Sequence, residues 1–134
     1  MATSATPADH RLTGTPWAVR IGRGEAGRAA LEVYDAETLV DVVVETPVAP
    51  ETLRGARRGV SAGRPCAIAW GRLPAGTDLP EVLFAGWTRR CPADVFLVGG
   101  FCWLAVAHGR FTTVRVTHRG TPCGRLRIRD GHRP

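Results

Sequence analysis

Short hydrophobic runs that alternate with polar residues cover most of the chain beyond residue 14, and glycine, proline or charged residues separate them. A period of two residues is typical of a β-strand with one buried and one solvated face. This pattern predicts strands at Trp17–Ile21, Ala29–Asp35, Leu39–Glu45, Pro65–Leu73 and Glu81–Arg89. We expect the last two of these strands to form a hairpin around a connecting loop, Pro74–Pro80.

One segment has the period of a helix instead of a strand. Pro50–Val60 begins with proline, which is tolerated at a first helical position, and places Leu53, Ala56 and Val60 on one helical face. Gly55 weakens this pattern, because glycine is a poor helix former. The sequence therefore predicts at most one short helix.

The strongest β pattern lies in Val95–Arg129, which we expect to fold as a four-stranded meander. Gly99-Gly100 separates two apolar runs, an arrangement typical of a hairpin. Phe101–Ala107 is apolar at every position, so we expect this strand to be central and covered on both faces. The later strands alternate, with valine, leucine or isoleucine on the predicted buried face and mostly arginine or threonine on the other.

Together these patterns predict a mainly-β protein in which an antiparallel meander forms a β-sandwich or a partly open barrel. We expect residues 15–130 to form a single β-rich domain, residues 1–14 a flexible tail and residues 131–134 a frayed end. Residues 1–14 lack the apolar centre of a secretory signal, and the longest apolar run is shorter than a membrane-spanning helix. The expected location is therefore the cytoplasm, with no contact with a membrane.

The charge of the chain is segregated. Residues 109–134 hold seven arginines and one acid, whereas residues 1–108 hold eleven arginines and eleven acids, so the whole net charge of +6 lies in the last segment. Lysine is absent, and a GC-rich coding sequence is one cause that we expect for the abundant arginine. Coding composition does not by itself account for the segregation.

If the last two strands pair, four arginines should lie on one outer face of the sheet: Arg115, Arg125, Arg127 and Arg129. Like charges opposite one another destabilise a sheet, so we interpret this row as a candidate anion-binding site. Two other interpretations remain open. The row is either neutralised by acids of this protein or a neighbouring subunit, or it is a solvated face.

The aromatic residues argue against binding of single-stranded nucleic acid. Proteins of that class combine basic residues with aromatic platforms, and the predicted arginine face carries no aromatic side chain. Trp70, Trp87 and Trp103 lie within apolar runs and are predicted to be core residues. Nucleic acid would therefore be held by its backbone charge alone.

No catalytic, metal or cofactor site is predicted. The four cysteines lack the Cys-x-x-Cys spacing, and we expect reduced thiols in a core. A nucleophilic pair of Cys91, Cys102 or Cys123 with His108 or His118 is a minor alternative. The acids Asp35, Glu37 and Asp41 lack the glycine and the spacing of a calcium loop.

We therefore interpret the chain first as a non-enzymatic interaction protein that associates with itself or with a protein partner. The first alternative is an anion-binding module, with nucleic acid as the leading ligand of the arginine row. The second alternative is a small cysteine–histidine enzyme.

Overall fold

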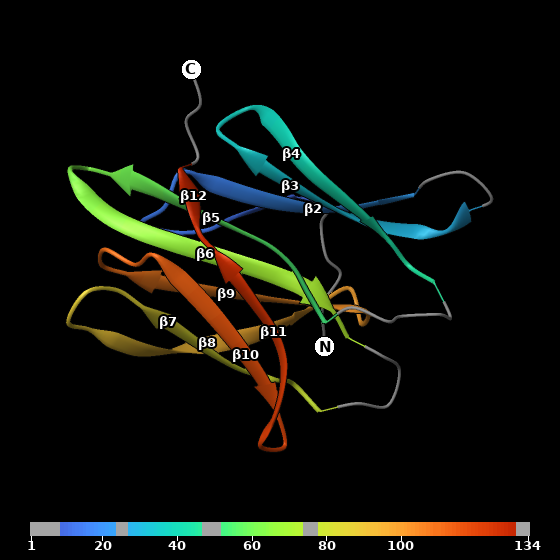
Figure 1. Ribbon diagram of the computed structural model, residues 1–134. Helices are drawn as coiled ribbons and strands as arrows, with labels where there is room; N and C mark the ends of the chain where they lie inside the picture. The colour runs from blue at the N-terminus through green and yellow to red at the C-terminus, as the bar shows by residue number, and fades with distance from the viewer. Residues whose placement is uncertain (1–8, 24–26, 47–51, 74–77, 131–134) are drawn as a thin grey trace.

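The computed structural model describes residues 9–23, 27–46, 52–73 and 78–130, and within them the regular structure consists of strands without an α-helix (Figure 1). The strands form two sheets, one of four strands and one of eight. The predicted mainly-β, antiparallel fold is confirmed. Residues 1–8 and 131–134, which belong to the predicted tail and frayed end, lie outside the described residues.

The smaller sheet is an antiparallel meander in sequence order. It comprises β1 (Asp9–Arg11), β2 (Trp17–Arg23), β3 (Ala29–Asp35) and β4 (Thr38–Val44). The first strand lies where a flexible tail was predicted, and it pairs with β2 through its backbone. A three-residue strand carries too little alternation to be recognised from sequence.

The larger sheet curls until its two ends meet. Its strands are β5 (Leu53–Ser61), β6 (Arg64–Arg72), β7 (Glu81–Ala85), β8 (Arg90–Val98), β9 (Cys102–His108), β10 (Thr113–His118), β11 (Thr121–Arg127) and β12 (Arg129–Asp130). Their order is β11-β10-β7-β8-β9-β6-β5-β12. The strands at the opposite ends, β11 and β12, are separated in the chain only by Ile128. One continuous segment therefore pairs with β10 on one side and, in parallel orientation, with β5 on the other, which gives a barrel-like sheet.

The buried side chains form two hydrophobic cores. One fills the inside of the curled sheet and includes Phe84, Trp103 and Phe111, each with no exposed surface. The other lies between the two sheets and includes Trp17 and Leu104. Strand β9 contributes side chains to both cores, so the prediction that the Phe101–Ala107 strand is covered on both faces is confirmed.

The predicted helix is wrong, because residues 53–61 form strand β5 between β6 and β12. Gly55 explains this difference. A Cβ atom at Gly55 would lie 2.6 Å from Cζ2 of Trp70 on the neighbouring strand, so the glycine makes room for an indole ring. The residue that weakens a helix here is required by the packing of a sheet.

Two predicted strand pairings are also wrong. Strands β6 and β7 do not form a hairpin, because β6 lies between β5 and β9 whereas β7 lies between β8 and β10. Strands β9 and β10 are not neighbours either, so the Val95–Arg129 meander consists of two hairpins, β8–β9 and β10–β11, at different places in the sheet. Gly99 and Gly100 both have positive φ, 65° and 81°, in the turn of the first hairpin.

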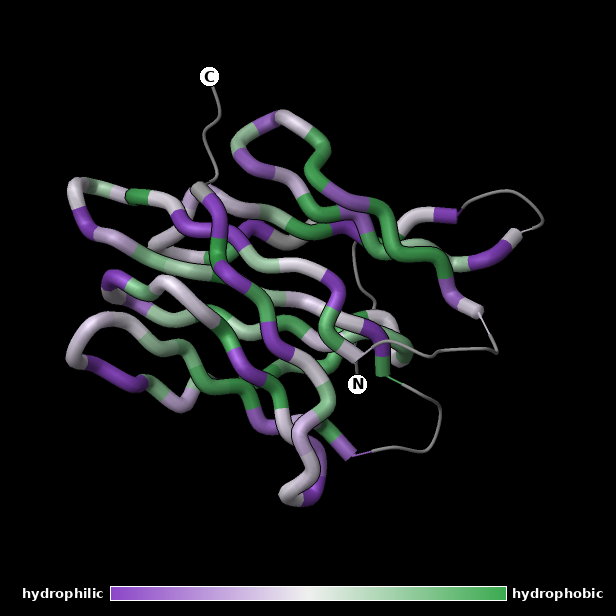
Figure 2. Tube along the Cα trace, viewed as in Figure 1, coloured by the Kyte–Doolittle hydropathy of each residue, from purple (hydrophilic) through white to green (hydrophobic). Residues whose placement is uncertain are grey.

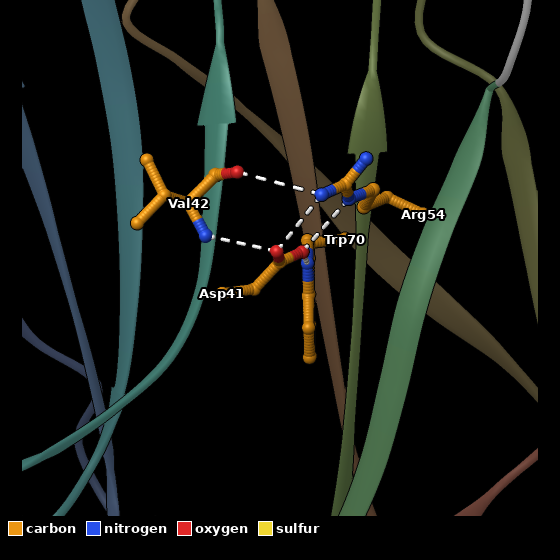
Figure 3. Close-up of polar contacts among 4 residues, drawn as sticks. All are labelled: Asp41, Val42, Arg54 and Trp70. Atoms are coloured by element: carbon orange, nitrogen blue, oxygen red, sulfur yellow. Dashed lines mark hydrogen bonds and ion pairs between the residues drawn. The ribbon is translucent and has the colours of Figure 1, made fainter. Parts of the chain in front are cut away.

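A polar cluster joins the two sheets at the exposed edge of β4 (Figure 3). The Asp41 carboxylate accepts hydrogen bonds from Arg54 Nε at 3.0 Å, Trp70 Nε1 at 2.8 Å and the backbone N–H of Val42 at 2.8 Å. Arg54 also donates to the Val42 carbonyl, at 3.5 Å. Both backbone groups of Val42 are therefore bonded to side chains, which blocks strand addition at this point of the edge.

Candidate functional site

The predicted arginine row forms on the outer face of the curled sheet. Arg115 on β10 lies directly opposite Arg125 on β11, and Arg127 lies opposite Thr113. Leu126 and Ile128 point into the barrel core, so the arginines between and beside them point outward. Figure 2 shows the corresponding alternation of hydrophobic and hydrophilic residues along this last segment of the chain.

All four arginines of the row are exposed, and none forms an ion pair with another described residue. Glu81 lies on the adjoining strand β7, directly opposite Thr117. The Glu81 carboxylate accepts a hydrogen bond of 3.1 Å from the Thr117 hydroxyl. The acids of the smaller sheet pair elsewhere: Glu32 with Arg20, Asp35 with Arg57 and Asp41 with Arg54. The row is therefore a surface of positive charge that these acids do not balance.

Arg129 extends the row towards a second group of arginines. It lies on β12, and its register partner on the parallel strand β5 is Arg57. Partners in a parallel pair project to the same face of the sheet, so the two guanidinium groups project from the same face of neighbouring strands. Arg57 lines a groove, and the row thus leads from the outer barrel face to that groove.

The groove has a volume of about 1360 Å³ and lies where Pro16, just before β2, meets five further segments. These are the β3–β4 turn, the end of β5, the start of β6, the β7–β8 turn and the connection from β9 to β10. The charged residues that line it are Arg57, Arg58, Arg89, Arg110 and Asp35. Four guanidinium groups against one carboxylate make the groove strongly basic.

Contacts with neighbouring segments hold three of these arginines in place. Arg57 Nε lies 3.8 Å from Asp35 Oδ2, which links β5 to the smaller sheet. Arg58 donates a hydrogen bond of 3.4 Å to the carbonyl of Phe111, and the guanidinium of Arg89 lies 5.9 Å from the centre of the Phe111 ring. Because Phe111 is fully buried, it gives the two arginines a fixed support.

Trp87 also lines the groove, and the prediction that it is a core residue is wrong, because 96% of its surface is exposed. It lies in the tight β7–β8 turn, which is closed by a hydrogen bond from Gly86 N–H to the Arg89 carbonyl. A Cβ atom at Gly86 would lie 2.5 Å from the carbonyl oxygen of Arg110, so glycine allows the turn to lie against that segment. Trp70 and Trp103 are buried, as predicted.

The cysteines and histidines do not form a hydrogen-bonded pair within the described residues. Burial raises the pKa of the Cys66 thiol and raises that of Cys102 to about 12, so both remain protonated at neutral pH. His118 and Cys123 line the same small pocket, of about 410 Å³, but the His118 ring donates from Nε2 to the Asp78 carbonyl. The part of the chain that the structure describes contains no cluster of metal-ligating side chains.

The arginine row was predicted from the sequence, but the groove was not. The row is encoded in the alternation of two neighbouring strands, whereas the groove collects residues from segments far apart in the chain. A signal for Trp87 was present, because glycine precedes it and threonine and two arginines follow it. That composition favours a turn over the continuation of an apolar strand.

Within the described residues, no helix has the length and apolar character that would let it cross a membrane. Comparison of the chain with protein-family models, with curated proteins and with solved structures found no match.

Proposed function

We propose that this protein is a non-enzymatic module that binds nucleic acid through the phosphate backbone, using the arginine row Arg115, Arg125, Arg127 and Arg129. The single observation that supports this proposal most strongly is the direct opposition of Arg115 and Arg125, both exposed and neither ion-paired with a described residue. Like charges in this relation destabilise a sheet by roughly 0.2–1 kcal/mol. A bound anion would reverse the sign of that contribution.

The chemistry of the row favours phosphate. A guanidinium group presents a planar fork of donors that matches the oxygens of a phosphate group. Alternate residues of a strand lie about 6.8 Å apart, so the guanidinium groups of the last segment repeat at a regular interval. Arg125, Arg127 and Arg129 are therefore spaced to contact a repeating series of charges and not only a single anion.

The first experiment measures nucleic-acid affinity as a function of salt concentration. We expect the double variant Arg115→Gln/Arg125→Gln to bind more weakly, and we expect the slope of log K against log salt to fall by roughly two, because each phosphate contact contributes about one. The matched control is Arg11→Gln/Arg64→Gln, which removes the same charge from two exposed positions outside the row. Equal slopes for the two double variants, or affinity that does not depend on salt, would contradict the proposal.

A second candidate function, association with another copy of the chain, is favoured by the exposed apolar side chains of β4. Leu39, Val42 and Val44 are 49%, 37% and 36% exposed on the edge strand of the smaller sheet. The backbone N–H and carbonyl of Val42 are already hydrogen-bonded to side chains. This association would therefore use the outer face of β4 more than its edge.

Light scattering tests the second candidate. Association through β4 predicts a mass of about twice the 14.4 kDa of one chain, and Val42→Glu should restore the single mass. The control Val60→Glu changes an equally apolar, exposed residue on another strand. A mass of one chain at all concentrations, or a dimer that Val42→Glu leaves intact, excludes this surface.

A further inference from the structure

We propose that the arginine-lined groove receives unpaired nucleotides, so that the preferred ligand is single-stranded nucleic acid. This inference rests on the proposed function and makes it more specific. It depends on a different set of residues, chiefly Trp87, Arg89 and Arg110, which line the groove and not the row.

The exposure of Trp87 is the first argument. A tryptophan side chain that is 96% exposed leaves both faces of its indole in water, which is unfavourable unless a ligand covers it. The other three tryptophans of the chain are buried at 0–2% exposure. The protein therefore buries every large aromatic ring of this kind except the one beside the arginines.

The combination of groups in the groove is the second argument. Proteins that bind single strands place aromatic rings, on which bases stack, next to basic side chains that follow the phosphates. Arg89 and Arg110 are exposed, and Trp87 is two residues from Arg89 in the same turn. The missing aromatic platform, which argued against a single-strand binder at the level of sequence, is thus present at the groove.

Contacts with neighbouring segments also support the groove. The Trp87 turn is closed by its own hydrogen bond and lies against the backbone of Arg110 at Gly86, and Arg89 lies over a buried ring. A duplex keeps its internal bases stacked on one another and offers none of their faces to Trp87. The groove should therefore distinguish single strands from duplexes, whereas the arginine row contacts both.

The experiment compares an oligothymidylate of about 12 nucleotides with a duplex of the same length, by anisotropy and by intrinsic tryptophan fluorescence. We expect the single strand to quench the emission of the native protein, because only Trp87 is accessible. Trp87→Ala should remove the quenching and weaken single-strand binding roughly tenfold, while duplex affinity changes less than about twofold. Trp87→Phe should retain most of the single-strand affinity, since it keeps a ring.

The arginines are tested in parallel. Arg89→Gln/Arg110→Gln should weaken single-strand binding more than duplex binding, whereas the row variant Arg115→Gln/Arg125→Gln should weaken both. If the Trp87→Ala variant bound the single strand as tightly as the native protein does, the inference would be overturned but the proposed function would remain. Absence of salt-dependent binding to either nucleic acid, or binding only to an acidic polypeptide such as polyglutamate, would overturn both.

Discussion

Asp41 combines burial, charge and backbone hydrogen bonding in one side chain. Partial burial raises the pKa of its carboxyl group, but the hydrogen bonds from Arg54, Trp70 and Val42, together with the charge of Arg54, outweigh burial and leave the pKa lowered from its ordinary value of 3.8. The ionised carboxylate is therefore the form that the folded protein favours. Because the three donors come from β4, β5 and β6, this carboxylate connects the smaller sheet to the curled one.

Asp41→Asn should lower the free energy of unfolding at pH 7 by about 1–3 kcal/mol, because it removes a charged acceptor from three donors. A carboxyl group whose pKa is lowered on folding contributes stability above its unfolded pKa, and that stability is lost as the pH falls through the folded pKa. The difference between the native protein and the variant should therefore shrink below about pH 3.8. Urea denaturation at several pH values measures this difference.

The control for Asp41 is Glu37→Gln, in the turn of the same hairpin, where the side chain is exposed. Its effect on stability should stay within about 0.5 kcal/mol at every pH. An Asp41→Asn variant as stable as the Glu37→Gln variant at pH 7 would show that the cluster contributes nothing to the junction of the sheets.

At the scale of strands, the sequence specified which residues lie in strands better than it specified which strands pair. Alternation identified β2, β3 and β4 and the burial of Val114 and Val116, because one buried face leaves a period of two in the chain. Pairing depends on contacts between distant segments. A two-residue turn at Ala62-Gly63 joins β6 to its neighbour β5, but nothing local in β6 indicates that its other neighbour is β9.

The same distinction separates the two parts of the candidate site. The arginine row could be predicted because Arg125, Arg127 and Arg129 follow a strand period and β10–β11 is a local hairpin. The groove could not be predicted, because Arg57, Arg89 and Arg110 are brought together only by the curling of the sheet. Trp87 shows a further limit, since the residues around it favour a turn but do not reveal that its ring stays in water.

At the scale of the whole molecule, the closure of the curled sheet depends on a short segment. Ile128 is 3% exposed in the barrel core, and its N–H donates a hydrogen bond of 2.8 Å to the Thr112 carbonyl. This residue lies between β11 and β12 and so fixes the point where the chain changes partner from β10 to β5. Its side chain is therefore placed to stabilise both ends of the sheet at once.

Ile128→Ala should lower the free energy of unfolding by about 2–5 kcal/mol, the usual cost of this truncation in a core. Hydrogen exchange of the β5 amides that face β12 should accelerate more than exchange in β6, because the parallel pairing loosens first. The control Val60→Ala removes apolar atoms from a residue that is 62% exposed and should change stability by about 0.5 kcal/mol or less. Uniform acceleration of exchange across both strands would contradict a local role in closure.

The order of the strands along the chain has a consequence for biosynthesis. On a translating ribosome, β5 to β10 emerge before β11 and β12. Until β11 and β12 follow, β5 and β10 are unpaired edge strands of the nascent sheet. Pairing between β12 and β5 also connects residues that are about seventy positions apart, and such long-range contacts slow folding. The protein should accordingly complete its fold late and be most prone to misassembly with other nascent chains just before its last strands appear.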